Sequence, residues 1–202
     1  VLIVCPKSVV GVWPREIARH VVDADCWHVV RLDTGSTERN VARAEMAIGL
    51  AKARGDRLAL VVNYESAWRP ELAKLLLKQS WDTVICDESH RAKAHNGRAS
   101  KFLAQLTSRA RRRLALTGTP MAHTPLDVFA QFRFLDPSIF GTSWYAFSHR
   151  YGAWGGFGNH QLVGLMNEAD WNTRCYSLAS RVGPEVRDRP PVLDDRVIAV
   201  EL

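Results

Sequence analysis

The chain has 202 residues, of which 47% are hydrophobic and 24% are charged, and its formal net charge is +6 with an isoelectric point near 9.4. This length suits one substantial domain, and no apolar run reaches the length of a membrane span, so we expect a soluble protein without a membrane partner. Four widely spaced cysteines form no C-x-x-C pair, which predicts neither a zinc site nor a disulfide framework and favours a reducing, intracellular setting. The basic excess suits a polyanionic partner, although a solvated surface explains it equally well.

Short apolar segments alternate with segments of helical spacing through the first two thirds of the chain. The predicted strands are rich in Val, Ile and Leu and span Val1–Cys5, Trp27–Leu32, Leu58–Val62, Thr83–Cys86 and Leu114–Leu116. The predicted helices cover Val12–His20, Asn40–Ala53, Glu71–Lys78, Ser100–Arg109 and Leu126–Leu135. Ser36 or Thr37 is placed to cap the second helix, and Gly55 to end it. The alternation predicts an α/β fold: a parallel sheet with helices on both faces and ligands beyond the carboxyl ends of the strands.

The texture of the sequence changes after Pro137. The stretch YGAWGGFGNHQLVG (151–164) contains five glycines and three aromatics, which predicts a loop or irregular hairpin projecting from the sheet domain. Its aromatics can stack on bases or, more commonly, pack on their own domain. Further on, RDRPPVLDD indicates a connection that leaves a domain before the strand-like RVIAVEL. We therefore expect a partial sheet domain at 1–140, an irregular or helical insertion packed on it at 141–186, and a connection at 187–202.

The segment VICDESH (84–90) runs a predicted strand directly into two adjacent carboxylates. Asp87 would lie where parallel sheets bind ligands and is placed to hold a magnesium ion, and Glu88 is placed to orient an attacking water. An isolated Asp-Glu pair, however, more often marks a strand that ends in polar residues at the surface.

The segment RLALTGTP (113–120) repeats this design, with Thr117, Gly118 and Thr119 following an apolar run. The hydroxyls can hydrogen-bond a carboxylate or an imidazole, although a plain β-turn explains the segment at least as well. The thirty residues from Asp87 to Thr117 are enough for a loop, a helix and a returning strand. Both segments can therefore line one crevice.

Four segments in this order resemble the first RecA-like lobe of the Swi/Snf-type ATPases of helicase superfamily two, with phage and bacterial branches closer than eukaryotic remodellers. They are VLIVCPKSVVGVWPREI (1–17), LVVNYESAW (60–68), WDTVICDESHRAKA (81–94) and RRLALTGTPMAHTPLDVFAQFRFLDPSIFG (112–141). The resemblance covers nearly the whole chain. It implies a RecA-like fold, ATP and Mg²⁺ as cofactors, and movement on nucleic acid driven by ATP hydrolysis.

The resemblance also implies roles for individual residues. Residues 87–90 match the DExH box, so Asp87 would hold magnesium, Glu88 would be the catalytic carboxylate, and His90 would link the nucleotide state to the nucleic-acid groove. Residues 117–119 match the motif that couples hydrolysis to movement.

Two further segments match motifs that meet nucleic acid in the family. Lys7 and Ser8 resemble a loop that approaches the backbone, a role for which a lysine and a hydroxyl are suited. Asn63 and Tyr64 stand where the family often has Thr-Tyr, and the Asn keeps a hydrogen-bonding side chain at that position.

The sequence departs from the family in one respect. The phosphate-binding loop G-x-x-x-x-G-K-[ST] is missing, because no Gly-Lys dipeptide occurs in the 202 residues. We expect that loop upstream and a second RecA-like lobe downstream of the given residues, so the fragment alone should not hydrolyse ATP efficiently. The prediction is a first-lobe fragment of an ATP-dependent translocase or helicase on double-stranded DNA. It would act in the cytoplasm of a bacterial or phage-infected cell, or in the nucleus of a eukaryote.

Two other interpretations remain open. A non-catalytic nucleic-acid-binding or scaffold module with the same fold is favoured by the missing phosphate loop. A doubly wound enzyme for a small molecule would need a glycine-rich dinucleotide loop after the first strand, where CPKSVVGVW (5–13) offers one glycine.

Overall fold

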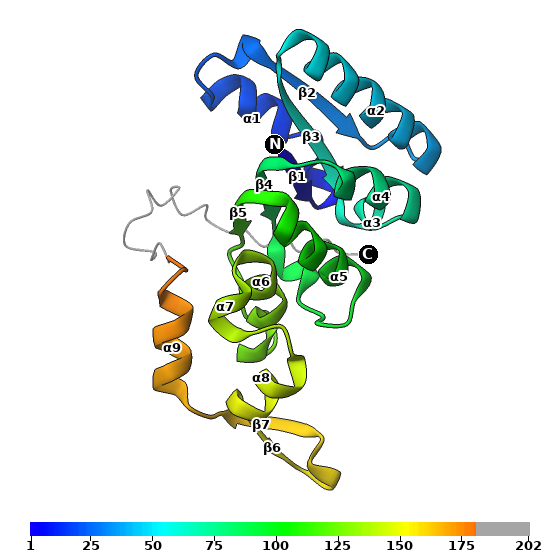
Figure 1. Ribbon diagram of the computed structural model, residues 1–202. Helices are drawn as coiled ribbons and strands as arrows, with labels where there is room; N and C mark the ends of the chain where they lie inside the picture. The colour runs from blue at the N-terminus through cyan, green and yellow to red at the C-terminus, as the bar shows by residue number, and fades with distance from the viewer. Residues whose placement is uncertain (181–202) are drawn as a thin grey trace, which may run out of the picture.

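The computed structural model describes residues 1–180, and it contains a five-stranded parallel sheet with the strand order β2-β3-β1-β4-β5 (Figure 1). The strands are β1 (Leu2–Cys5), β2 (Trp27–Leu32), β3 (Arg57–Asn63), β4 (Trp81–Asp87) and β5 (Ala110–Leu116). The predicted α/β fold is confirmed. The predicted connection at 187–202, with its strand-like end, lies outside the described residues.

Nine α-helices are described within residues 1–180. They are α1 (Trp13–His20), α2 (Thr37–Arg54), α3 (Tyr64–Ala67), α4 (Pro70–Lys78), α5 (Arg98–Leu106), α6 (Val128–Leu135), α7 (Pro137–Phe140), α8 (Trp144–Tyr151) and α9 (Glu168–Tyr176). The ends of α2 follow from its sequence. The Ser36 hydroxyl accepts a hydrogen bond from the Arg39 amide, and Gly55 ends the helix with a φ of 73°, a conformation that suits glycine.

Side chains alternate along each strand, so both faces of the sheet carry apolar residues. Helices cover both faces. In β1, Leu2 and Val4 face a core shared with α2, α4 and α5. Ile3 and Cys5 face the other side, where Ile17 of α1 covers them. All four strand residues are buried, so β1 lies at the centre of the sheet, between β3 and β4.

The strand β5 forms an edge of the sheet within the described residues. It starts at Ala110, four residues earlier than expected, and so includes three arginines. The strand accommodates them because Arg111 and Arg112 are exposed, and the Arg113 guanidinium donates to the carbonyls of Leu135 and Thr107 at 2.6 and 2.7 Å. On the face covered by α1, Leu114 and Leu116 remain 48% and 44% exposed.

The region after residue 140 is built on an aromatic cluster. It contains the predicted hairpin, formed by β6 (Gly152–Gly155) and β7 (Gln161–Leu165), at the far end of the molecule from the sheet (Figure 1). The buried members of the cluster come from α6, α8 and α9 and from the turn before α6: Leu126, Val128, Phe129, Phe132, Phe147, Tyr151, Trp171 and Cys175. At the hairpin tip, Phe157 is fully exposed. Within residues 1–180, no helix is both long and apolar enough to cross a membrane.

Candidate functional site

The carboxyl ends of β4 and β5 bring the acidic pair and the threonine turn together. The two strands are parallel neighbours, with Asp87 opposite Leu116, so the residues that follow them leave the sheet side by side. The Thr117 hydroxyl lies 3.3 Å from Glu88 Oε2 and donates to it. The proximity predicted from the sequence is therefore confirmed.

Glu88 turns the chain sharply at the end of β4. Its backbone has φ 49° and ψ 52°, the left-handed region that glutamate rarely adopts, and a 3₁₀ turn (Ser89–Ala92) starts directly after it. Holding a non-glycine residue there costs on the order of 1–3 kcal/mol, and such conformations cluster at functional sites. The turn directs the carboxylate toward Thr117 and leaves 44% of the side chain accessible to solvent.

His90 completes a small polar cluster with these two residues. Its Nδ1 lies 2.9 Å from Thr117 Oγ1 and 3.2 Å from Glu88 Oε2. When Nδ1 carries a proton, it can donate to Thr117 Oγ1 and to Glu88 Oε2. The Thr117 hydroxyl then accepts from His90 and donates its own proton to Glu88. The Thr119 amide also donates to Thr117 Oγ1, at 3.1 Å. One hydroxyl thus connects the acidic turn to the threonine turn.

A second connection between the two turns runs through Gln131 of α6, which the sequence analysis missed. Its Oε1 accepts from the buried Ser89 hydroxyl, and its Nε2 donates to the Pro120 carbonyl, both at 2.7 Å. Gln131 is 6% exposed. A glutamine within the apolar stretch VFAQFRF was the available signal, because a buried amide needs polar partners.

Asp87 is held by hydrogen bonds from two sides. The Trp13 indole of α1 donates to its carboxylate, with Nε1 3.1 Å from Oδ2, and the Tyr64 hydroxyl donates to its main-chain carbonyl at 2.9 Å. Burial is the main cause that raises the pKa of Tyr64, and the nearby Cys86 and Asp87 raise it further. The phenol therefore keeps its proton and stays a hydrogen-bond donor. Burial and then the charge of Asp87 raise the pKa of the Cys5 thiol to about 12.

The carboxylate oxygens at this edge are suited to bind a magnesium ion together with a nucleotide. Residues 1–180 contain no group of three or more His, Cys, Asp or Glu side chains that could hold a metal ion by themselves. Magnesium keeps several waters and is usually bound through one or two carboxylates and the phosphates of a substrate. The Asp87 carboxylate, with Glu88 next to it, supplies that kind of donor set.

The four candidate nucleic-acid residues divide into an exposed and a buried pair. Lys7 and Ser8 are exposed in a 3₁₀ turn (Lys7–Val9) just after β1. Asn63 and Tyr64 are 5% and 4% exposed, and the Asn63 side chain accepts from the Ser66 amide at 2.8 Å. Because the second pair is buried and bonded internally, the structure argues against the direct nucleic-acid contact predicted for it.

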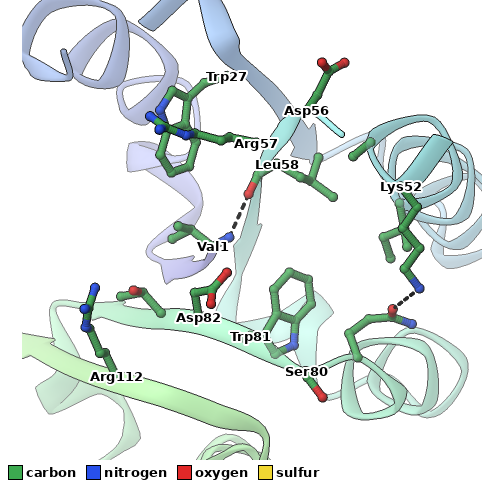
Figure 2. A pocket seen from close by; sticks show the side chains of 14 residues that line it. Val1, Trp27, Lys52, Asp56, Arg57, Leu58, Ser80, Trp81, Asp82 and Arg112 are labelled. Atoms are coloured by element: carbon green, nitrogen blue, oxygen red, sulfur yellow. Dashed lines mark hydrogen bonds between the residues drawn. The ribbon is translucent and has the colours of Figure 1, made fainter. Parts of the chain in front are cut away.

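A pocket lies at the opposite end of the sheet. About 480 Å³ in volume, it is lined by residues at the starts of β2, β3 and β4, including Trp27, Arg57 and Trp81 (Figure 2). The backbone nitrogen of Val1 lies in it and donates to the Leu58 carbonyl at 2.7 Å. None of the predicted site residues lines this pocket.

Comparison with known proteins agrees with this architecture. The SNF2-related domain matches residues 1–166. The chain is 30% identical over 142 residues to the DNA repair and recombination protein RAD54-like of Drosophila persimilis, an alignment that covers 70% of this chain and 17% of that protein. It is 32% identical over 139 residues to the ISWI chromatin-remodeling complex ATPase ISW1 of Saccharomyces cerevisiae, covering 69% of this chain and 11% of that protein.

A solved structure shares the fold. It is the Sulfolobus solfataricus SWI2/SNF2 ATPase core, determined in complex with double-stranded DNA. The match covers 74% of this chain and 27% of the solved chain, with a TM-score of 0.57 and 21% identity. The fold is therefore the RecA-like α/β fold of that core. Because the domain match covers most of its length, the chain belongs to the SNF2-related domain family. It spans less than a fifth of the length of the curated relatives described above.

Proposed function

We propose that this chain is part of the first lobe of an ATP-dependent DNA translocase or helicase. The observation that carries the proposal is the hydrogen-bonded cluster of Glu88, His90 and Thr117 at the carboxyl edge of a RecA-like sheet. In open α/β sheets this edge is where ligands bind. Membership of the SNF2-related domain family gives the cluster its context.

In this proposal the two carboxylates divide the work of ATP hydrolysis. Asp87 holds magnesium directly or through its waters, and the half-exposed Glu88 orients and polarises the water that attacks the terminal phosphate. Magnesium, when bound, neutralises charge on the phosphates. His90 and the turn at 117–119 respond to the nucleotide, because Thr117 contacts the carboxylate that faces it.

We further propose that residues outside the given sequence supply the phosphate-binding loop. Two observations support this. First, the outer edge of β5 has no partner strand within residues 1–180. Second, Leu114 and Leu116 are exposed on the face beside the site. An added strand and helix would cover both and would bring phosphate-binding amides next to Glu88.

Double-stranded DNA is the proposed partner, and Lys7 and Ser8 are the proposed backbone contacts. Asn63 and Tyr64 are instead bonded within the fold, to the Ser66 amide and the Asp87 carbonyl. The exposure of Lys7 and Ser8 and the formal charge of +6 support this assignment. The solved neighbour was determined with double-stranded DNA. Backbone contacts predict affinity that falls steeply with salt and depends little on sequence.

Several finer assignments rest on the sequence and stay proposals. They are the boundaries 1–140 and 141–186, a second RecA-like lobe, origin in a phage or bacterial branch, and action in the cytoplasm or, in a eukaryote, in the nucleus. The non-catalytic scaffold is the second candidate function, and the observation that favours it is the absence of a Gly-Lys dipeptide from the sequence.

ATP turnover by the full-length protein, with and without duplex DNA, tests the proposal. Glu88→Gln should lower DNA-stimulated turnover by about 10²–10⁴-fold, because the amide cannot act as a base for the attacking water. Glu45→Gln, an exposed change on α2, is the matched control and should keep wild-type turnover. Turnover of Glu88→Gln within twofold of wild type would rule out the catalytic role, and a wild-type protein without DNA-stimulated turnover would favour the scaffold.

A further inference from the structure

The hydrogen bond from Trp13 to Asp87 joins two parts of the proposed machinery that are 74 residues apart in the sequence. Trp13 donates to the carboxylate that is proposed to hold magnesium. Within residues 1–180 the Trp13 indole is the only hydrogen-bond donor to this carboxylate, and it bonds to Oδ2. Oδ1 has no donor in that part of the chain, so it remains free to face an ion or its waters.

An indole is well suited to orient a carboxylate. Its Nε1–H can only donate, so the direction of the bond is fixed, unlike a bond from a hydroxyl or an imidazole. Groups that hydrogen-bond a metal-holding carboxylate fix its orientation and tune its affinity for the ion. The Trp13 ring also packs against the core under α1.

Trp13 is connected in turn to the exposed residues proposed to meet DNA. The Val9 amide donates to the Pro6 carbonyl at 2.9 Å, and the Val12 amide donates to the Val9 carbonyl at 2.8 Å. These bonds make one run of tight turns from Lys7 to the start of α1. We therefore expect a displacement of the turn that holds Lys7 and Ser8 to reach the start of α1, where the indole lies.

There is room for the indole to respond. A pocket of about 300 Å³ lies between α1 and the end of β4, lined by Val9, Val12, Trp13, Glu16 and Asp87. A close-packed interior would hold the ring in one place, whereas an open pocket beside it permits a shift. The pocket is thus lined by Val9 at the end of the turn, by Trp13 and by Asp87.

We propose that Trp13 is a positioning residue that transmits DNA binding at Lys7 and Ser8 to the carboxylate of Asp87. This inference rests on the proposed function and deepens it, because it names the route by which DNA promotes productive magnesium–nucleotide binding. Tyr64 holds the main chain of Asp87 in place, so movement of the indole acts on the carboxylate and not on the strand.

The test measures metal binding and does not depend on hydrolysis. Mn²⁺, as a spectroscopic substitute for magnesium, is titrated by electron paramagnetic resonance into the full-length protein with a non-hydrolysable ATP analogue, with and without duplex DNA. Trp13→Phe removes the N–H and keeps an aromatic ring. Trp154→Phe is the matched control, because Trp154 also donates one indole bond, to the Ser148 carbonyl at 3.1 Å, in the hairpin far from the site.

We expect DNA to tighten Mn²⁺ binding in wild type and in Trp154→Phe. In Trp13→Phe, Mn²⁺ binding without DNA should weaken about tenfold, the size expected for one hydrogen bond to a charged group, and the tightening by DNA should be lost. DNA binding without nucleotide should stay within about twofold, because coupling acts only when both ligands are bound.

A double-mutant cycle with Lys7→Ala separates transmission from simple packing. If Trp13 carries the signal, Lys7→Ala reduces the DNA effect on Mn²⁺ in wild type and has no further effect in the Trp13→Phe background. Independent, additive effects would overturn the inference, as would a Trp13→Phe protein that behaves like Trp154→Phe. DNA-stimulated ATP turnover in wild type, measured alongside, shows whether the proposed function itself holds.

Discussion

The sheet region and the aromatic region of this molecule are built in different ways. The sheet is held by backbone pairing between five parallel strands and by aliphatic side chains that alternate between two cores. The region after residue 140 has one two-stranded hairpin and is held by ring contacts, such as Phe129 on Phe147 with centroids 5.0 Å apart. An ionic group adds to it, in which Asp170 accepts from Tyr151, Arg150 and Arg174.

The two regions also differ in where their polar residues lie. In the sheet region a hydrogen-bonded polar cluster lies at the carboxyl edge, where Glu88 and Thr117 leave adjacent strands. In the aromatic region the rings of Phe140, Phe147 and Tyr151 pack edge to face or tilted. The ionic group around Asp170 lies at the surface of this region. The difference indicates that the sheet region presents the site, whereas the aromatic region stabilises α6, the helix that carries Gln131.

The largest expected stability effect lies in the aromatic cluster. Phe147→Ala should lower the free energy of unfolding by about 3–5 kcal/mol, because it removes a buried ring from a cluster of rings. Phe157→Ala, at the exposed hairpin tip, is the control and should change it by less than about 0.5 kcal/mol. Urea unfolding measures both. Equal effects would show that the cluster does not stabilise this region.

The link between the regions is tested at Gln131. Gln131→Leu keeps the size of the side chain but leaves the Ser89 hydroxyl and the Pro120 carbonyl without their partner, so it should cost about 1–3 kcal/mol in urea unfolding. Gln105→Leu, at an exposed position of α5, is the matched control. A Gln131→Leu protein as stable as Gln105→Leu would mean that the two turns are not joined through α6.

The smallest effect concerns the strained turn at the site. Because Glu88 has a φ of 49°, Glu88→Gly should be more stable to urea than Glu88→Ala by about 1 kcal/mol, since glycine adopts the left-handed region without a steric cost. Both variants lose the carboxylate equally. If the alanine variant proved the more stable, the left-handed turn would not be a strained feature.

The sequence alone allowed the positions of the five strands along the chain and the two polar turns to be predicted. Both are visible in short stretches of sequence. Buried parallel strands are continuous apolar runs, and VICDESH and LALTGTP show the point at which each run ends. Parallel neighbours then place their carboxyl ends together, so the contact of Glu88 with Thr117 could be expected from the topology.

Only the tertiary structure decided which distant side chains share this edge. Tyr64 is buried in the core that α2, α4 and α5 share with the sheet. The bridge through Gln131 and the bond from Trp13 to Asp87 depend on how α6 and α1 pack. No period or motif in a single sequence encodes these contacts, because each joins elements that are remote along the chain. The sequence determined the pairs of carboxylates and hydroxyls at the strand ends, and the packing of the helices determined what holds them in place.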